Sequence, residues 1–412
     1  RDFDFASMLS HSWTYQALIH DVLDFQRNRV QYSTQERGRA VKKVYDISVQ
    51  DFFWAQNAAD PFPQVAVEVD EESKRFKKQA EEITRMGGVS DLEEISQLDM
   101  TTNTKLLKSA ISALPELTAR KAIIDMHMNI ATAVLNIIKE RQLDVFFQLE
   151  EAIHKQSKQT LLEAIQDPSK TTPEDKLRLF LIYYLTVGDF SDQDYQKFEE
   201  ALEAAGCNLA PLRYIKKSRS LSQLSTVSTQ PTGGPAVKTG SDLLGRFSSI
   251  GSKLTDHLRE GGGNLSSIIA GVRNLLPSRR DLPVTAIVEA LLQGGISGER
   301  SSSFANLPSV PGASPPGTVS GGAVGTEDYL YLDPKQTKRG ALASSGARLA
   351  RPKVAYSDAV VFIVGGGNYL EYQNLQQFAQ TSVPPKSITY GATEICNPTQ
   401  FLQQLAALAP LA

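Results

Sequence analysis

The sequence predicts a mostly helical α+β fold. Amphipathic helical patterns recur through the first half of the chain, and the longest runs from Thr104 to Gln142. After Ala355 the pattern changes to an apolar strand, a glycine-rich turn, a helix and a second strand. Continuous apolar strands are typical of parallel sheets covered on both faces. We therefore expect a smaller α/β part with a parallel sheet beside a larger helical part.

Composition excludes several classes of protein. The 412 residues leave room for two to four domains, and the net charge of −3 gives no basic field that would indicate a nucleic-acid partner. Cys207 and Cys396 are far apart, so neither a disulfide framework nor a zinc site is expected, and a reducing cytosolic setting fits. No signal peptide or membrane-spanning run is present. Because the chain begins without methionine, we expect a piece of a longer protein.

Four segments precede the long stretch. We expect a strand end and loop over Arg1–Leu9, a helix over Trp13–Phe25 and a polar connection over Gln31–Lys43, and we expect Tyr45–Trp54 to open a new unit. A polar helix follows over Val65–Met86, and its apolar residues lie seven apart. So narrow a stripe can cover only one neighbouring helix, either the long stretch or a helix of another protein.

The Thr104–Gln142 stretch organises the prediction. Its apolar residues recur at steps of three and four, which mark one helix face, and glycine is absent. At ~1.5 Å per residue it could reach roughly 50 Å. Pro115 removes one helical hydrogen bond, so the stretch is either two helices, Lys105–Leu114 and Glu116–Gln142, or one bent rod. Pro115 is either a structural kink or a hinge that meets a partner.

Three shorter helices follow. Thr171–Val187 and Ser191–Ala205 begin with capping signals and carry apolar faces, and Leu212–Leu221 is short and basic. Residues 222–240 are rich in Ser, Thr, Gly and Pro, a composition typical of disorder.

Two amphipathic segments come next, and both have polar faces with few charges. We interpret them as a mobile lid that can contact both loosely packed bilayer and the protein's own helices. A permanently docked hairpin is the alternative. The expected lid and membrane contacts are Leu243, Phe247, Ile250, Leu254, Leu258, Ile268, Ile269 and Val272.

The last third of the chain opens with a short helix, Pro283–Leu292, and a low-complexity linker over residues 294–350. The α/β elements after it are the strand Ala359–Val364, the turn Gly365–Gly367, the helix Glu371–Gln380, the strand Ser387–Tyr390 and the helix Thr399–Leu408. Asn397 can cap that last helix.

We find no arrangement of residues that could catalyse a reaction. The triple glycine Gly365–Gly367 suggests a nucleotide site, but Leu370 stands where the dinucleotide motif requires glycine. A turn that needs positive φ explains these glycines as well. The histidines have no metal-ligand spacing, and His127 is expected to be packed or hydrogen-bonded. We therefore expect no enzyme, no metal and no cofactor.

Several motifs, in order along the chain, resemble one family. They are SWTYQALIHDVLD at Ser12–Asp24, LPEL at Leu114–Leu117, TPEDK at Thr172–Lys176, LFLIYY at Leu179–Tyr184, AGCNL at Ala205–Leu209, VGGGNYLEY at Val364–Tyr372 and YGATEI at Tyr390–Ile395. Together they are similar to the SM (Sec/Munc-like) family of SNARE-assembly proteins, in particular its Sly-type ER–Golgi branch. The segments 222–240 and 294–350 do not match closely.

The resemblance implies part of an arch-shaped fold. Residues 1–30 and 281–412 would form a split, Rossmann-like α/β second domain, into which a large helical domain is inserted. Residues 45–150 would be helical domain 3a with its long hairpin, and residues 151–221 helical domain 3b. Residues 222–280 would be the branch's long lid over the surface of this hairpin, which is implicated in self-inhibition and membrane contact. The family's amino-terminal domain, which grips a syntaxin peptide, would be absent.

The resemblance also implies a function. In the family, the hairpin holds an R-SNARE helix beside a Qa-SNARE and templates their assembly for vesicle docking and fusion. The SNARE-binding positions carried over are Leu114, Pro115, Leu117, Ile124, His127 and Met128. The expected partners are a Golgi syntaxin (Qa-SNARE), an R-SNARE and their assembled bundle, with a monomeric protein lying peripherally on ER, Golgi and vesicle membranes.

Two other functions remain open. One is a tethering scaffold that binds membranes without SNARE specificity. The other is a nucleotide-binding α/β enzyme that uses Gly365–Gly367.

Overall fold

The computed structural model describes residues 4–36, 38–86, 100–187, 190–227, 282–292 and 355–409. The chain divides into two compact units, and each is described by itself. One comprises Arg1–Ser7 and Arg279–Ile395, and the other comprises Met8–Ser278 and Cys396–Ala412. This division differs from the expected domains in placing residues 8–30 and 396–412 with the helices. The expected domain assignment itself stays a prediction.

The chain opens with two short helices, the first of which spans the boundary between the two units, and an antiparallel sheet. α1 (Ala6–Leu9) stands where we expected a strand end, so that expectation is wrong. α2 (Tyr15–Val22) is shorter than predicted, and its Leu18 and Ile19 are fully buried. The sheet then follows the order β1 (Asp24–Gln26), β2 (Arg29–Glu36), β3 (Arg39–Asp46).

The β2–β3 hairpin occupies the segment that we predicted as a polar connection. Val30 pairs with Tyr45 and Tyr32 with Lys43, so these side chains share one face, while the other face is mostly polar and exposed, with Val44 as its large apolar residue. Gly38 at the turn has φ +79°, a conformation that favours glycine. The prediction failed because a strand covered on one face needs few apolar residues.

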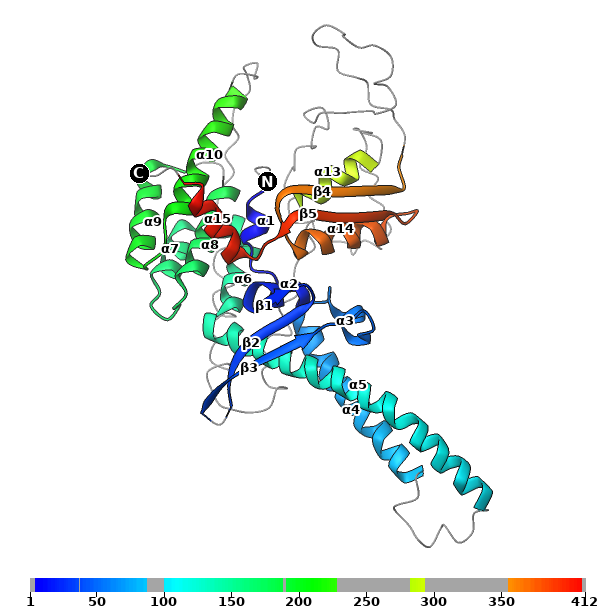
Figure 1. The fold of residues 1–412 in the computed structure, drawn as a ribbon. Helices are drawn as coiled ribbons and strands as arrows, with labels where there is room; N and C mark the ends of the chain where they lie inside the picture. The colour runs from blue at the N-terminus through cyan, green and yellow to red at the C-terminus, as the bar shows by residue number, and fades with distance from the viewer. Residues whose placement is uncertain are drawn as a thin grey trace, which may run out of the picture. The chain divides into compact units, whose positions relative to one another are not determined.

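The helical hairpin follows. After the short α3 (Phe52–Asn57), α4 (Phe62–Met86) and α5 (Met100–Arg141) lie side by side and extend away from the other elements of this unit (Figure 1). α5 is one helix of 42 residues with Pro115 inside it. Of the two predicted forms, the structure therefore has the single rod. α6 (Leu143–Glu151) turns the chain back after Gln142, whose φ is +53°.

The remaining helices of this unit pack around a core of aromatic rings. α7 (Lys158–Gln166), α8 (Pro173–Thr186), α9 (Asp192–Ala204) and α10 (Ala210–Val227) follow in order. Phe180 of α8 stacks on Phe198 of α9 with ring centroids 4.8 Å apart. α15 (Pro398–Ala407) packs against α10, and Asn397 caps it through a capping box, as predicted.

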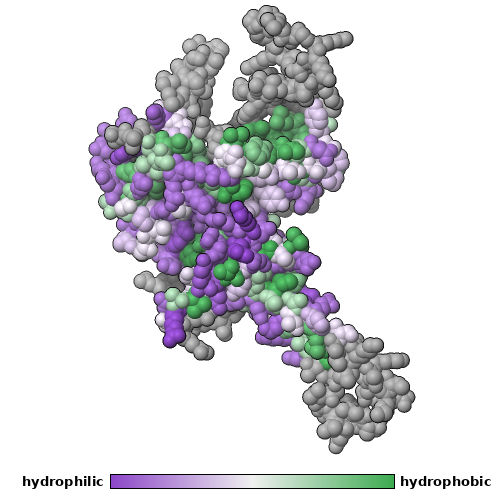
Figure 2. Space-filling view, viewed as in Figure 1, coloured by the Kyte–Doolittle hydropathy of each residue, from purple (hydrophilic) through white to green (hydrophobic). Residues whose placement is uncertain are grey.

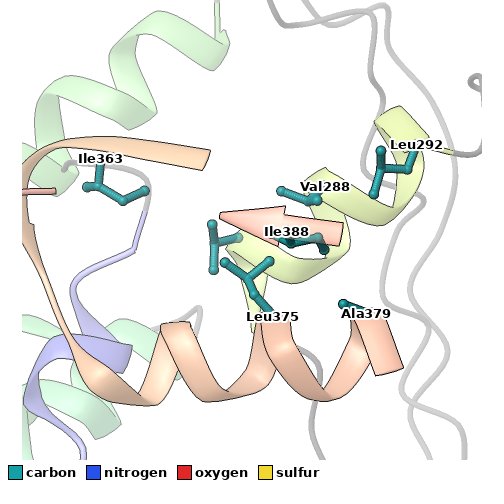
Figure 3. Packing of buried hydrophobic residues seen from close by; sticks show 7 residues of the cluster. Val288, Leu292, Ile363, Leu375, Ala379 and Ile388 are labelled. Atoms are coloured by element: carbon teal, nitrogen blue, oxygen red, sulfur yellow. The ribbon is translucent and has the colours of Figure 1, made fainter. Parts of the chain in front are cut away.

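The smaller unit is an α/β layer. β4 (Asp358–Gly367) and β5 (Ser387–Ile395) form a parallel pair, which confirms the predicted strands with longer bounds. α13 (Pro283–Leu292) and α14 (Tyr369–Thr381) cover one face. Figure 3 shows Val288, Leu375 and Ile388 converging in this core, which also buries Ile363.

The opposite face of β4 is exposed, against our expectation of a strand buried on both faces. Val360, Phe362 and Val364 retain 79%, 59% and 75% of their accessible surface. Figure 2 shows hydrophobic residues on the surface of this unit. β4 does contain the apolar run that we predicted as a strand. Within the described residues, however, no element covers the side chains on the face opposite α13 and α14.

Candidate functional site

The candidate site is the α4–α5 hairpin, which α2 and α3 hold through a buried histidine. The His127 side chain of α5 has no exposed surface. Its Nε2 lies 2.9 Å from Asp51 Oδ2, and its Nδ1 lies 3.0 Å from the Tyr15 hydroxyl. The other oxygen of Asp51 accepts the Trp54 backbone N–H at 2.8 Å and so caps α3. One ring therefore ties α5 to two other helices.

A second cluster joins the two helices of the hairpin. Glu72 of α4 accepts from Arg120 Nη2 of α5 at 2.6 Å and from Arg75 Nη1 at 2.5 Å. Burial alone would raise the pKa of Glu72, but the two guanidinium groups outweigh it and lower that pKa. Arg120 also lies over the Phe52 ring, 4.7 Å from its centroid. Since Glu72 is nearly buried, the pair fixes the register of α4 against α5 more firmly than a surface ion pair would.

The base of α5 is anchored by a buried ionic network. Arg141 makes two hydrogen bonds to Asp175 of α8, at 2.9 and 2.5 Å. Arg178, one turn further along α8, bonds Asp21 of α2 at 3.1 and 2.8 Å and the Leu9 carbonyl at 2.7 Å. Burial alone would raise the pKa of Asp175, but hydrogen bonds from His11 and Arg141 hold it far below its usual range. The long helix therefore stands on a fixed base.

Beyond His127, α5 presents apolar side chains to solvent. Leu114 is 51% exposed, Pro115 is exposed, and Leu117 and Met128 are half-buried. Between them, Lys121 and Asp125 form an exposed ion pair one helical turn apart. Figure 2 shows hydrophobic residues among polar ones on this part of the hairpin. The surface is thus a mixed strip with a charged pair in the middle.

Two of the predicted SNARE-binding positions do not belong to this strip. Ile124 is 3% exposed and His127 is fully buried, so neither can contact a partner without unpacking the hairpin. The expectation that His127 is packed and hydrogen-bonded is confirmed. The family resemblance placed these residues with Leu117 and Met128, but Ile124 and His127 lie on the side of α5 that packs against the rest of the unit. The reachable set is Leu114, Pro115, Leu117 and Met128.

The predicted lid residues, from Leu243 to Val272, lie outside the described part of the chain. The described residues include the helix before them, α10, which continues to Val227 where we predicted an end at Leu221. The alternative of a docked hairpin in this segment stays a prediction as well.

The glycines that suggested a nucleotide site have packing roles. Gly365 has φ +112°, as the positive-φ explanation requires, although it lies within β4 and not in a turn after it. The Thr393 hydroxyl accepts its backbone N–H at 2.8 Å. A side chain at Gly367 would lie 2.4 Å from the Tyr390 hydroxyl. Asn368 then caps α14 through its side chain.

Two negative observations concern the described residues alone. They contain no group of His, Cys, Asp and Glu placed to hold a metal ion. They also contain no helix with both the length and the apolar composition that a bilayer crossing requires.

Sequence reasoning missed the β2–β3 hairpin, which leans on α5. The Tyr32 hydroxyl donates to the Asn129 carbonyl of α5 at 3.2 Å. The available signal was the Arg37-Gly38 turn between segments in which Val30, Tyr32, Val41 and Tyr45 occupy alternate positions. The ionic network was also missed, because it joins residues from distant parts of the chain: Arg141 and Asp175 are 34 residues apart, and Arg178 and Asp21 are 157 apart.

Comparison with known families identifies the class of protein. The model of the Sec1 family matches residues 1–404. This chain therefore belongs to the Sec1 family, which supports the resemblance to SM proteins.

The chain is similar to Sly1 proteins within that family. It is 43% identical to Protein sly1 of Schizosaccharomyces pombe over 410 residues, which cover 99% of this chain and 60% of that protein. Identity to Sec1 family domain-containing protein 1 of Mus musculus is 38% over 426 residues, covering 99% of this chain and 59% of that protein. The chain thus spans about three fifths of the length of these relatives.

Solved structures share the fold. The crystal structure of Sly1p in complex with an N-terminal peptide of Sed5p matches with a TM-score of 0.65 and 32% identity, and covers 99% of this chain and 58% of that one. The SM protein Vps45 in complex with the Qa-SNARE Tlg2 matches with a TM-score of 0.61 at 18% identity, which shows the fold alone. The mostly helical α+β fold of the SM proteins is thereby confirmed.

Proposed function

We propose that this chain is the SNARE-binding part of a Sly-type protein and acts by binding, without covalent chemistry. Its family and its likeness to Sly1p, whose structure holds a Sed5p peptide, support a syntaxin-type Qa-SNARE of ER–Golgi transport as partner. The proposed site is the exposed strip of α5, defined by Leu114, Pro115, Leu117 and Met128.

One observation carries this proposal: a 42-residue helix leaves apolar side chains uncovered while its base is fixed by buried polar contacts. A SNARE motif is an amphipathic heptad helix, and such a helix binds by laying its apolar face along a matching surface. The contacts of His127 and Arg141 hold the base of α5 in place, so the strip is exposed without any motion of this base.

The Lys121–Asp125 pair sets the register of the bound helix. The pair lies between Leu117 and Met128, so a partner that packs on both must present polar or charged residues opposite it. Charges that lose water at a contact without a partner are costly. The pair therefore favours some heptad helices over others, in addition to fixing the position of a bound helix along α5. This is the sequence requirement that we expect of a cognate SNARE.

The finer parts of the proposal are templating and membrane location. We propose that an R-SNARE occupies the α5 strip while the Qa-SNARE lies beside it, so that the two zipper on this surface. We also propose that the protein lies peripherally on ER and Golgi membranes. The sequence pattern of residues 222–280 supports a lid that contacts the membrane or shields the strip.

Met128→Arg tests the site. The substitution places an unpaired charge at an apolar contact, so we expect isolated R-SNARE motif to bind at least tenfold more weakly in isothermal titration calorimetry. The control is Asn136→Arg, which adds the same charge at an exposed position two turns further along α5. Equal affinity of the two variants would exclude Met128 from the interface.

A further inference from the structure

The exposed face of α10 carries a cluster of positive charge. Arg213, Lys216 and Lys217 lie three and four residues apart, so they share one side of the helix, and all three are exposed. None of them forms an ion pair with the residues that the structure describes. On the opposite side, Leu212 and Ile215 are buried. We call these three cations the α10 basic face.

Neighbouring helices contact one residue of this face and anchor α10 one turn beyond it. The Lys216 ammonium lies over the Tyr195 ring of α9, 3.6 Å from the centroid. One turn later, Arg219 stacks on Tyr184 at 4.6 Å and donates to the carbonyls of Tyr184 and Val187 at the carboxyl end of α8. A cation suits that helix end because the carbonyls there lack other donors. Arg219 is therefore engaged within the protein, whereas Arg213 and Lys217 are exposed and Lys216 keeps an exposed side chain beside the Tyr195 ring.

The charged groups around the basic face leave it positive. α15 packs against α10 and contains no ionisable residue. On α9, Glu199 is the acid whose charge acts on Tyr195 together with that of Arg213. Three exposed cations outnumber this half-buried carboxylate, and such an excess of positive charge favours an anionic partner.

The sequence around the face distinguishes a membrane from an acidic protein. Residues 210–280 contain 11 Lys and Arg against 3 Asp and Glu, although the whole chain has net charge −3. Within this basic stretch lie the two amphipathic patterns, Asp242–Glu260 and Asn264–Leu276. Cations beside amphipathic sequence are typical of segments that lie on anionic lipid, whereas an acidic protein partner would not need the apolar residues.

From these observations we propose that the α10 basic face contacts the headgroups of an anionic membrane. The face comprises Arg213, Lys216 and Lys217, and it acts independently of the SNARE site on α5. The face supplies electrostatic attraction to the membrane, which a neutral amphipathic segment lacks. It also orients the protein so that α10 faces the membrane. Because a cation near an anionic bilayer strengthens binding by about fivefold, three of them should strengthen it by roughly 100-fold at low salt.

The test is vesicle flotation of the protein with three vesicle compositions. The variant Arg213→Gln, Lys216→Gln, Lys217→Gln removes the face, and the control Lys42→Gln, Lys139→Gln, Lys155→Gln removes the same charge from exposed positions on other elements. Vesicles of phosphatidylcholine alone, with phosphatidylserine and with phosphatidylinositol separate charge from lipid identity. Circular dichroism checks that both variants fold.

The proposal predicts that the α10 variant binds anionic vesicles 10- to 100-fold more weakly and that the control binds like the parent protein. Binding by the parent should weaken as salt rises from 50 to 300 mM, because exposed charges are screened over about 10 Å at 0.1 M. Three results would overturn the proposal: no binding of the parent to anionic vesicles, equal binding by the α10 variant, or an equal loss by the control. Affinity for an isolated SNARE motif should not change in the α10 variant, so failure here is distinguishable from failure of the SNARE proposal.

Discussion

His11 shows how single residues in the buried network respond to pH. Its Nδ1 lies 2.5 Å from Glu150 Oε1 and its Nε2 lies 3.1 Å from Asp175 Oδ1, while its ring stacks on Phe146. Burial lowers the pKa of His11, as does the charge of Arg178, but Glu150 and Asp175 outweigh both and the pKa is raised. The folded protein therefore favours the imidazolium.

The sign of the resulting pH dependence follows from that shift. A raised pKa in the folded state gives stability that is fully present below the unfolded value, about 6.5, and is lost as pH rises through the folded pKa. We expect the free energy of unfolding to fall as pH rises above 6.5, and His11→Gln to remove that slope. Urea denaturation at several pH values above 6.5 measures it. His20 contributes a slope of the opposite sign near pH 6.5, because burial lowers its folded pKa to about 4 while its unfolded form still titrates there, so the fall due to His11 is clearest above about pH 7.5.

The control for His11 is His154→Gln, since His154 is exposed. It should keep the slope of the parent protein. If His11→Gln also keeps that slope, another group is responsible for it and the assignment to His11 is wrong.

At the scale of elements, Pro115 decides whether α5 is a rod or a hinge. The helix continues through Pro115, whose ring nitrogen cannot donate to the carbonyl four residues earlier. Pro115→Ala restores that donor, so we expect slower amide hydrogen exchange in α5 on both sides of residue 115. If the proline is only a structural feature, the affinity for a SNARE motif should change less than threefold.

A hinge would give a different result. An affinity change of more than tenfold in Pro115→Ala, with the slower exchange still seen, would show that SNARE binding requires α5 to bend at this point. Ala119→Gly is the matched control, because it weakens the same exposed part of the helix by about 1 kcal/mol without altering the proline.

The elements also show why some predictions failed. Long amphipathic helices such as α5 and α8 were found because their period repeats over many residues. The β2–β3 hairpin was missed because only one of its faces is covered, which leaves a weak alternation. Ile124 and Met128 lie four residues apart and so occupy neighbouring positions on α5. Only the packing of α5 against the rest of the unit decides that Ile124 is buried and that Met128 is accessible to a partner.

At the scale of the whole molecule, the exposed face of β4 leads to a prediction about association of this chain. Val360, Phe362 and Val364 form a contiguous apolar strip, of a kind that soluble monomers rarely expose. We therefore expect the 412-residue chain to self-associate at high concentration, and the triple substitution Val360→Thr, Phe362→Thr, Val364→Thr to reduce this. Sedimentation velocity over a range of concentrations measures the change.

Isolated exposed valines provide the control. Val49 and Val383 are 98% and 97% exposed but have no such neighbours, so Val49→Thr, Val383→Thr should leave association unchanged. A monomer at every concentration in the parent chain would contradict this prediction and would agree with the monomer expected from the sequence.

The sequence by itself determined the fold class, the family and the long helix, because periodic patterns and ordered motifs can be read directly from the order of the residues. It also revealed that positive charge concentrates between residues 210 and 280. Tertiary structure alone decided that Arg219 anchors α10 while Arg213 stays exposed, and that His127 lies in the core while Leu114 reaches solvent. The physical reason is that burial and ion pairing depend on elements brought together from distant parts of the chain. The spacing of residues along a helix does not determine which neighbouring element will cover a given face.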